Sequence, residues 1–530
     1  RRTMKKVLLI LAMATMFFAC GAKGSKGSTF SLNLAAEPKS IDPQLSTDIA
    51  GGTVNELLSE GLLKRTPDGK PDPGIAEKWE VSSDGLKWTF HLRDAKWSNG
   101  DPITANDFKA AWIRGLDPKV ASEYAYMLYP IKNGELFNKG KVTADKVGIK
   151  VVDPKTLEVT LEAPTPYFSD LVTFKTYSPI NEKFLKEAGE KFDTEANQTI
   201  SSGPYVMKKW VHDSEMKFEK NPNYWNKDNV KVDNITYKLI PDNSAALNAF
   251  KNKEVQVTQI TAEQAREYEG KPELVKSKDG SVWYILPNLK NKFLSNSKIR
   301  KAILLAVDRD ELVKSVLNGT GESARTFVPS GIGIKGISKD FPEEVPTSIE
   351  KYNPQKAKQL FAEGLKELGM TSAPTLEVLI NDSGNNKPVA EFVQESLRKN
   401  LGLNLNVKAV TFQERVSRMA SKDFDLVLAG WSGDFKDPIT YLDLFVTGGG
   451  QNRGSYSNPQ YDALVKKIKS TADPNVRVPA MIELEKIIAD DTPVAVLYQR
   501  EKPYLMDTKV QGLKFTAIGG EFYFKNLSMK

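Results

Sequence analysis

The chain has 530 residues, enough for roughly three domains of ~150 residues each. Its hydrophobic content of 40% and charged content of 27% are typical of a soluble globular protein. Four basic residues near the N-terminus (Arg1, Arg2, Lys5 and Lys6) raise the formal charge to +7, and without them the 74 lysines and arginines fall to 70 against 67 acids. So weak a charge, with no dense basic cluster among aromatic residues, argues against a nucleic-acid-binding protein.

The first residues have the pattern of a targeting segment. Lys5 and Lys6 precede an apolar run from Val7 to Ala19 in which only Thr15 is polar. This run is too short to span a bilayer as a helix, and its length is typical of a signal-peptide core. We therefore predict a signal peptide over residues 1–19. Elsewhere no segment approaches ~18 unbroken apolar residues, so we expect a soluble body outside the cytoplasm.

Cys20 directly follows this run and is the only cysteine, so no intrachain disulfide is possible. Its place after Ala19 resembles a bacterial lipobox, in which the thiol is lipidated and becomes the mature N-terminus, although Phe17 stands where a leucine is usual. Residues 20–28 continue as a flexible Gly/Ser/Lys linker. We expect Cys20 to hold a lipid anchor; an ordinary signal peptide with an incidental cysteine is the alternative.

The N-terminal part of the body predicts strands and two helices. Residues 29–34 alternate like a half-buried strand, and residues 54–63 have helical spacing. Asp84-Gly85 predicts a turn between two strands, the second with Trp88, Phe90 and Leu92 facing inward. Thr104, followed by Asp107, predicts the N-cap of a helix.

The C-terminal half alternates strands and helices, which predicts a parallel sheet. An amphipathic helix begins at Asn353-Pro354 and stops at Gly369. After it we expect strands over residues 375–380, 403–412 and 425–431, with helices between them over residues 388–400 and 413–421.

The last of these strands ends in a loop that could hold a ligand. Its sequence is Gly430-Trp431-Ser432-Gly433-Asp434, and ligands of open α/β sheets bind outside the carboxyl ends of the strands. An aromatic wall beside a carboxylate suits a cationic group such as a free amine. The alternative is a tryptophan packed on its own domain with a solvated aspartate.

The motifs of common enzymes are missing. Only His91 and His212 exist, too few for the usual zinc sites, so we expect no metal. The loop at Gly430 fails the spacing of a nucleophile elbow and has no histidine after it. Residues 331–336 match G-x-G-x-x-G but follow a proline, and no G-x-x-x-x-G-K-[ST] is present. We therefore expect no catalytic residue and no cofactor.

A series of sequence blocks carries a family resemblance. The block from Ala76 to Phe108, with residues 37–43 ahead of it, resembles the extracytoplasmic solute-binding proteins of peptide ABC importers, the oligopeptide-binding members above all. Later blocks agree in order; they are Ser202–Tyr205, Asn221–Trp225, Ile299–Ala302, Ala306–Arg309 and Tyr352–Pro354.

The resemblance implies an α/β, periplasmic-binding-protein-like fold of two lobes joined by a hinge, with an inserted third domain. By alignment, the domains are residues 29–59 with 181–284 and 500–530 (domain I), residues 60–180 (inserted domain II) and residues 285–499 (domain III, the far lobe). We expect the lobes to be joined near residues 180–184, 284 and 498–502.

The resemblance also implies the function. We expect a monomeric, lipid-anchored lipoprotein on a bacterial membrane, in the periplasm or on the outer face of the cell membrane, that captures oligopeptides and delivers them to ABC transporter permease subunits. Another solute for the same fold is the alternative: a dipeptide, a pheromone peptide, a nickel complex or a sugar. A secreted hydrolase is a third hypothesis, but the chain lacks the catalytic residues that such an enzyme needs.

In this family, an aspartate three residues after a tryptophan pairs with the peptide α-amino group, a role that falls on Asp434. Trp431 would line the pocket, and Gly430 and Ser432 would offer backbone groups. The remaining positions that align with the ligand site are Thr47, Asp48, Ile49, Tyr124, Trp283, Tyr284, Asn381, Asn452, Arg453 and Tyr456. Arg453 could meet the peptide carboxylate, or it could be a solvated surface residue.

Overall fold

The computed structural model describes residues 27–67, 71–334, 337, 340–346, 349–518 and 521–530. The predicted signal peptide and Cys20 lie outside these residues. Among the described helices, none is long and apolar enough to cross a membrane.

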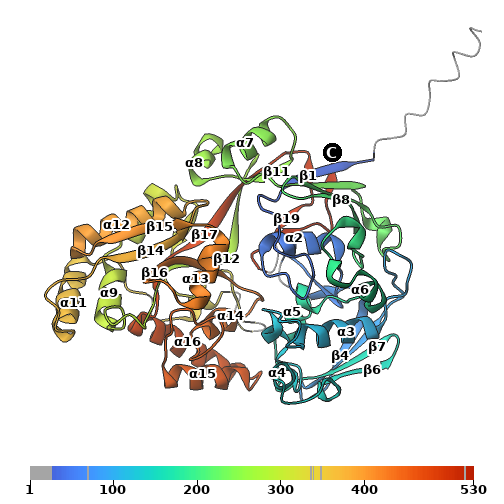
Figure 1. Ribbon diagram of the computed structural model, residues 1–530, viewed down its shortest axis with the longest axis horizontal. Coiled ribbons are helices and arrows are strands. Elements are labelled where there is room, and N and C mark those ends of the chain that lie inside the picture. The colour runs from blue at the N-terminus through green and yellow to red at the C-terminus, as the bar shows by residue number, and fades with distance from the viewer. Residues whose placement is uncertain (1–26, 68–70, 335–336, 338–339, 347–348, 519–520) are drawn as a thin grey trace, which may run out of the picture.

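One large sheet runs through two lobes (Figure 1). We call the described residues within 27–273 and 507–530 the near lobe and those within 288–494 the far lobe. In spatial order the main path of the sheet is β15 (Leu405–Val410), β14 (Leu376–Asn381), β16 (Leu426–Ser432), β12 (Leu274–Pro287), β17 (Ala495–Met506), β11 (Val257–Gln259), β1 (Thr29–Asn33), β10 (Asn234–Lys238), β9 (Glu215–Lys220) and β8 (Tyr205–Val211). The short strand β13 (Gly321–Ser323) pairs with β17 off this path.

The two long strands β12 and β17 link the lobes. They pair antiparallel from Leu274 opposite Leu505 to Ile285 opposite Ala495, with a register shift between Lys278 and Val282. Two predicted domain boundaries, after residues 284 and 499, fall within these strands. The predicted link at residues 180–184 is wrong, because this segment leads into α6 (Glu182–Ala188) beside α3 (Ala105–Leu116) and stays within the near lobe (Figure 1).

The first helix of the near lobe, α2 (Ile49–Leu58), overlaps the predicted span of residues 54–63 but begins and ends earlier. Asp48 starts it by accepting a hydrogen bond from the Gly51 amide at 2.6 Å. The helix stops at Ser59, whose backbone is extended. The next residue, Glu60, is buried and takes hydrogen bonds from Tyr224 and the Trp225 indole, so the chain must turn there.

A smaller antiparallel sheet lies within residues 60–180, in the order β4 (Ala76–Val81), β5 (Lys87–Leu92), β7 (Thr156–Thr160) and β6 (Ile149–Asp153). The predicted turn at Asp84-Gly85 joins β4 to β5, and the three predicted inward residues of β5 are buried. Thr104 and Asp107 form the predicted capping box of α3 (Ala105–Leu116).

The far lobe contains the predicted α/β units, with β14 parallel to both β15 and β16. The three predicted strands are therefore parallel, as expected. The linking strand β12 joins the same sheet and pairs with β16 antiparallel. The described α-helices of this lobe are α9 (Ser297–Leu305), α10 (Arg309–Glu311), α11 (Pro354–Glu367), α12 (Asn386–Leu401), α13 (Phe412–Ser421), α14 (Ile439–Leu442), α15 (Pro459–Lys469) and α16 (Pro474–Asp491).

The two largest apolar cores of the described residues hold these parts together. One lies in the near lobe, between α2, the sheet and the C-terminal residues. The other continues from the smaller sheet into the far lobe. The rings of Tyr167 and Phe435 stack across the junction, with centroids 4.7 Å apart and planes 7° from parallel. The two lobes are therefore in direct contact.

Candidate functional site

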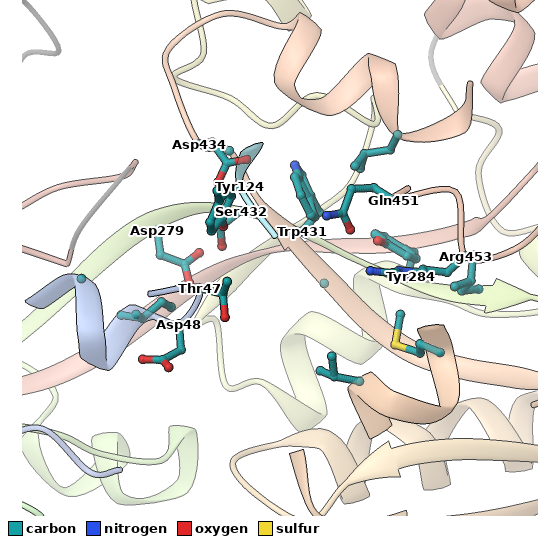
Figure 2. A pocket seen from close by; sticks show the side chains of 18 of the residues that line it. Thr47, Asp48, Tyr124, Asp279, Tyr284, Trp431, Ser432, Asp434, Gln451 and Arg453 are labelled. Carbon is teal, nitrogen blue, oxygen red and sulfur yellow. The ribbon is translucent and has the colours of Figure 1, made fainter. Parts of the chain in front are cut away.

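A cavity of about 320 Å³ lies between the lobes and is lined from both sides. Figure 2 shows Thr47 and Asp48 from the near lobe, Trp431 and Arg453 from the far lobe, and Asp279 from a linking strand. Ligand pockets in proteins are typically about 300–1,000 Å³ and join apolar walls to a few polar groups. The size and placement suit a ligand that touches both lobes.

The predicted anchor, Asp434, lies two residues past the end of β16, and its side chain is buried. Its backbone amide donates to the hydroxyl of Thr440 at 3.0 Å. The indole of Trp431 donates to the carbonyl of the same Thr440 at 2.9 Å. Thr440, at the start of α14, thus fixes the tryptophan and the aspartate of the motif together.

The two glycines of the motif allow close contacts. A Cβ at Gly430 would lie 2.6 Å from the ring of Trp283, and a Cβ at Gly433 would lie 2.6 Å from the hydroxyl of Tyr441. This hydroxyl accepts from the Gly433 amide and donates to the carbonyl of Gly280 at 2.6 Å. The loop that carries the anchor is therefore bonded to the linking strand β12.

The carboxylate of Asp434 reaches across to the near lobe. It accepts hydrogen bonds from the hydroxyls of Tyr124, at 3.2 Å, and Tyr126, at 3.0 Å. Arg65 donates to the backbone carbonyl of Asp434 at 3.2 Å. Because a carboxylate has about four acceptor positions, the two tyrosines leave capacity for an ammonium group.

Burial controls the charge of this region. It raises the pKa of the Asp434 carboxyl to about 6, against the opposing hydrogen bonds from its two tyrosines. Burial also lowers the pKa of the Lys175 ammonium to about 8, although Asp48 and Asp434 oppose that shift. Lys175 donates to the backbone carbonyl of Asp48 at 3.1 Å. The ammonium group of Lys175 therefore already has acidic groups of the protein near it.

At the edge of the near lobe, Thr47, Asp48 and Ile49 all line the cavity. Ile49 is 45% exposed, which is unusual for a large apolar side chain. The carboxylate of Asp48 accepts from the amides of Lys39 and Gly51 and so holds this edge in place.

The linking strands contribute a buried ionic cluster. The carboxylate of Asp279 pairs with Arg500 and lies 3.7 Å from the ammonium of Lys502. Lys502 also pairs with Glu521, which accepts from Tyr504 at 2.7 Å. The pKa of Asp279 stays below its usual value because these cations outweigh the cost of burial. Each charge of this cluster therefore has a partner within the protein.

The opposite end of the cavity is formed by α13 and by the loop after α14. One face of α13 lines it with Phe412, Arg415, Val416 and Met419. Phe412 is 54% and Val416 37% exposed, so this wall offers free apolar surface to a ligand.

Most predicted site residues meet at this cavity. Those that line it are Thr47, Asp48, Ile49, Tyr124, Tyr284, Gly430, Trp431, Ser432, Asp434, Asn452, Arg453 and Tyr456.

Two of the lining residues hold the wall with their polar groups. The Asn452 amide donates to the backbone of its own loop, including the carbonyl of Tyr456 at 2.7 Å, and the hydroxyl of Tyr456 donates to Asp491 at 2.5 Å. Their side-chain hydrogen bonds therefore position the loop.

Two predicted residues lie behind the wall. Trp283 packs against Gly430 and stacks on Tyr498, with ring centroids 6.1 Å apart. Asn381 is buried and donates to the hydroxyl of Ser383 at 2.7 Å. The structure thus gives both residues supporting contacts, because the strands that carry them turn these side chains away from the cavity.

Sequence reasoning missed several residues of the site. Tyr126 lies two positions after the predicted Tyr124, in the short helix η1 (Ala125–Leu128), so its nearness in sequence could have pointed to it. No sequence signal marked Arg415, Lys175 or Asp279 as site residues. Each becomes part of the site only through contacts with segments that are distant in the sequence. Within the described residues, no group of three or more histidine, cysteine, aspartate or glutamate side chains is arranged to hold a metal ion.

Comparison with known proteins identifies the family. Residues 70–453 match the model of the bacterial extracellular solute-binding proteins, family 5 Middle. The chain is 36% identical to the oligopeptide-binding protein OppA of Bacillus subtilis, over 99% of each chain. It is 32% identical to the dipeptide-binding protein DppE of the same organism, over 94% of this chain and 91% of the relative.

A solved structure agrees with these relatives. Listeria monocytogenes OppA bound to peptide superposes with a TM-score of 0.87 at 35% identity, covering 96% of this chain and 100% of that one. The chain therefore belongs to family 5 of the bacterial extracellular solute-binding proteins, and the predicted periplasmic-binding-protein-like fold is confirmed.

Proposed function

We propose that this protein captures oligopeptides outside the membrane and delivers them to the permease subunits of an ABC importer. The observation that carries the proposal is the buried carboxylate of Asp434, which lies in a cavity between two lobes with acceptor capacity to spare. A protonated peptide amine is a cation that fits this place, because a charge-assisted hydrogen bond is strongest where water is excluded.

The rest of the cavity supports a peptide ligand. The edge at Thr47 to Ile49 presents backbone beside an exposed apolar side chain, and α13 presents apolar surface opposite. Peptides are often held as an added strand by their backbone groups, which tolerates many side chains. The relatives named for oligopeptides and dipeptides favour the same class of ligand.

The role is that of a binding subunit without catalysis or cofactor, and it needs no nucleic acid. We propose a monomer divided at the domain boundaries given above and tethered to the membrane through lipid on Cys20. Replacing Cys20 by serine should release the protein from the membrane fraction. A Cys20→Ser protein that still pellets with membranes would contradict this anchor.

Native mass spectrometry of the purified protein tests the ligand class. Masses of retained peptides are expected, and a retained sugar, nickel complex or other solute would favour the alternative binder with the same fold.

The test of the anchor is Asp434→Asn, which should fold normally and weaken peptide binding by roughly 2–4 kcal/mol, since it leaves the peptide ammonium without its counter-charge. An N-acetylated peptide should bind the wild type poorly for the same reason. Calorimetry that gives equal affinity for free and acetylated peptides would remove Asp434 from this role.

A further inference from the structure

Arg415 is a buried cation of the cavity wall that has no anion within the described part of the chain. Only 7% of the residue is exposed. Its Nε makes no hydrogen bond, and an Nη contacts the sulfur of Met419 at 3.4 Å. The guanidinium lies over the ring of Phe412, 5.3 Å from its centroid. A buried charge is costly unless it is paired, so this arrangement calls for an external anion.

The other cations of the cavity differ from Arg415. Lys502 pairs with Glu521, and Lys175 has Asp48 and Asp434 near it. Arg453 makes no ion pair with the described residues either, but it is only half-buried and lies on a glycine-rich loop. Water can solvate Arg453, whereas Arg415 is buried.

Arg415 and Asp434 line the cavity from different elements, α13 and the loop after β16. Its charge interacts with Tyr284, a residue of β12. Figure 2 shows Tyr284 and Arg453 on one side of Trp431 and Asp434 with Tyr124 on the other. The cavity therefore has an acidic end and a basic end, with the apolar side chains of α13 beside the basic end.

We propose that Arg415 binds a carboxylate of the captured peptide, either its C-terminus or an acidic side chain, and so sets which peptides fit when Asp434 holds the amine. The planar guanidinium offers a fork of donors that matches a carboxylate, which a lysine cannot reproduce. This inference rests on the proposed function, and it assigns to Arg415 the contact that alignment suggested for Arg453.

The test is calorimetry with alanine peptides of three to six residues, each as the free acid and as the C-terminal amide. We expect the wild type to bind at least one free acid about 30-fold or more tightly than its amide, the scale of a lost partner in a buried charge pair. Arg415→Gln should abolish that difference, and Arg415→Lys should keep part of it. Amides with one glutamate at each position in turn distinguish the two sources, because recovered affinity would assign the carboxylate to a side chain.

Arg418→Gln is the matched control, since Arg418 lies on the same helix but pairs with Glu377 and Asp423. It should leave the preference for free acids unchanged, and the melting temperatures of all variants should show that they are folded. Equal binding of acids, amides and glutamate-containing amides by the wild type would overturn the proposal, as would a preference that survives Arg415→Gln. A wild type that binds no peptide in any form would overturn the proposed function together with this inference.

Discussion

Burial of the Asp434 carboxyl group makes both the stability of the protein and its binding of an ammonium group depend on pH. Burial raises this pKa from 3.8 to about 6, so the folded state holds a proton that the unfolded chain releases between these values. The contribution of Asp434 to stability is therefore greatest below pH 4 and is lost as the pH rises through about 6. Binding of an ammonium group has the opposite dependence, because only the ionised carboxylate attracts it.

We predict that the affinity for peptides with a free N-terminus falls as the pH drops below about 6. The expected loss approaches tenfold per pH unit, since one proton must leave for each peptide bound. Calorimetry at pH 7.5, 6 and 5 measures this. Asp434→Asn should bind weakly with little pH dependence, and an affinity of the wild type that is constant from pH 7.5 to 5 would contradict the assignment.

At the scale of elements, the most informative feature is the interruption of pairing between β12 and β17. The register shifts between Lys278 and Val282, and within this interval Gly280 has a φ of +60°. The carbonyl of Gly280 accepts the hydroxyl of Tyr441, which also bonds to the loop of Asp434. The irregular segment of the linking strand is thus coupled directly to the predicted anchor loop.

Gly280→Ala should therefore destabilise the protein by more than a left-handed backbone alone explains. An added Cβ would lie 2.5 Å from the carbonyl oxygen of Ala517, a backbone atom that cannot move aside freely. Gly369→Ala is the control, because Gly369 has a φ of +66° with no atom within 4 Å of the added carbon.

Left-handed strain costs roughly 1–2 kcal/mol, so Gly369→Ala should lose about that much unfolding free energy and Gly280→Ala clearly more. Chemical denaturation of both variants measures the difference. Equal losses would show that the clash at Gly280 relaxes without cost.

For the whole molecule, the contacts between the lobes describe a closed arrangement. Asp434 bonds to Tyr124 and Tyr126, and Phe435 stacks on Tyr167. Because β12 and β17 link the lobes, the lobes can rotate about them when these contacts break. A peptide that bridges both lobes must favour closure by its differential affinity for the closed state.

We predict that a tightly bound peptide reduces the radius of gyration measured by small-angle scattering. An unchanged radius at saturation would mean that the near-lobe residues do not contact the ligand or that the protein is already closed before binding.

Phe435→Ala should weaken peptide binding by about two- to tenfold, the scale of one aromatic pair, because it removes a contact made only on closure. The control is Phe361→Ala, whose ring pairs with Phe293 inside the far lobe, 6.1 Å between centroids. This variant should lose stability but keep the affinity of the folded fraction. Equal affinities for Phe435→Ala and the wild type would exclude the ring stack from closure.

Short sequence patterns were enough to predict the turns, the helix caps and the helix ends. The turn at Asp84-Gly85, the cap at Thr104 and the end of the helix at Gly369 follow from backbone rules that act within a few residues. The placement of Trp431 to Asp434 at the end of a buried strand was predicted in the same way. The start of α2 was missed, because the cap at Asp48 lies before the apolar spacing that marked the helix.

Only the tertiary structure decided which of these residues share a site. Tyr126 reaches Asp434 from a segment 308 positions away. Trp283 turns behind the wall because Gly430 leaves room for its ring. Arg415 and Arg418 lie on the same helix but in different surroundings. Arg418 pairs with an acidic residue, whereas Arg415 lines the cavity. The sequence shows which groups a chain carries, but pairing and burial depend on segments that meet only after folding.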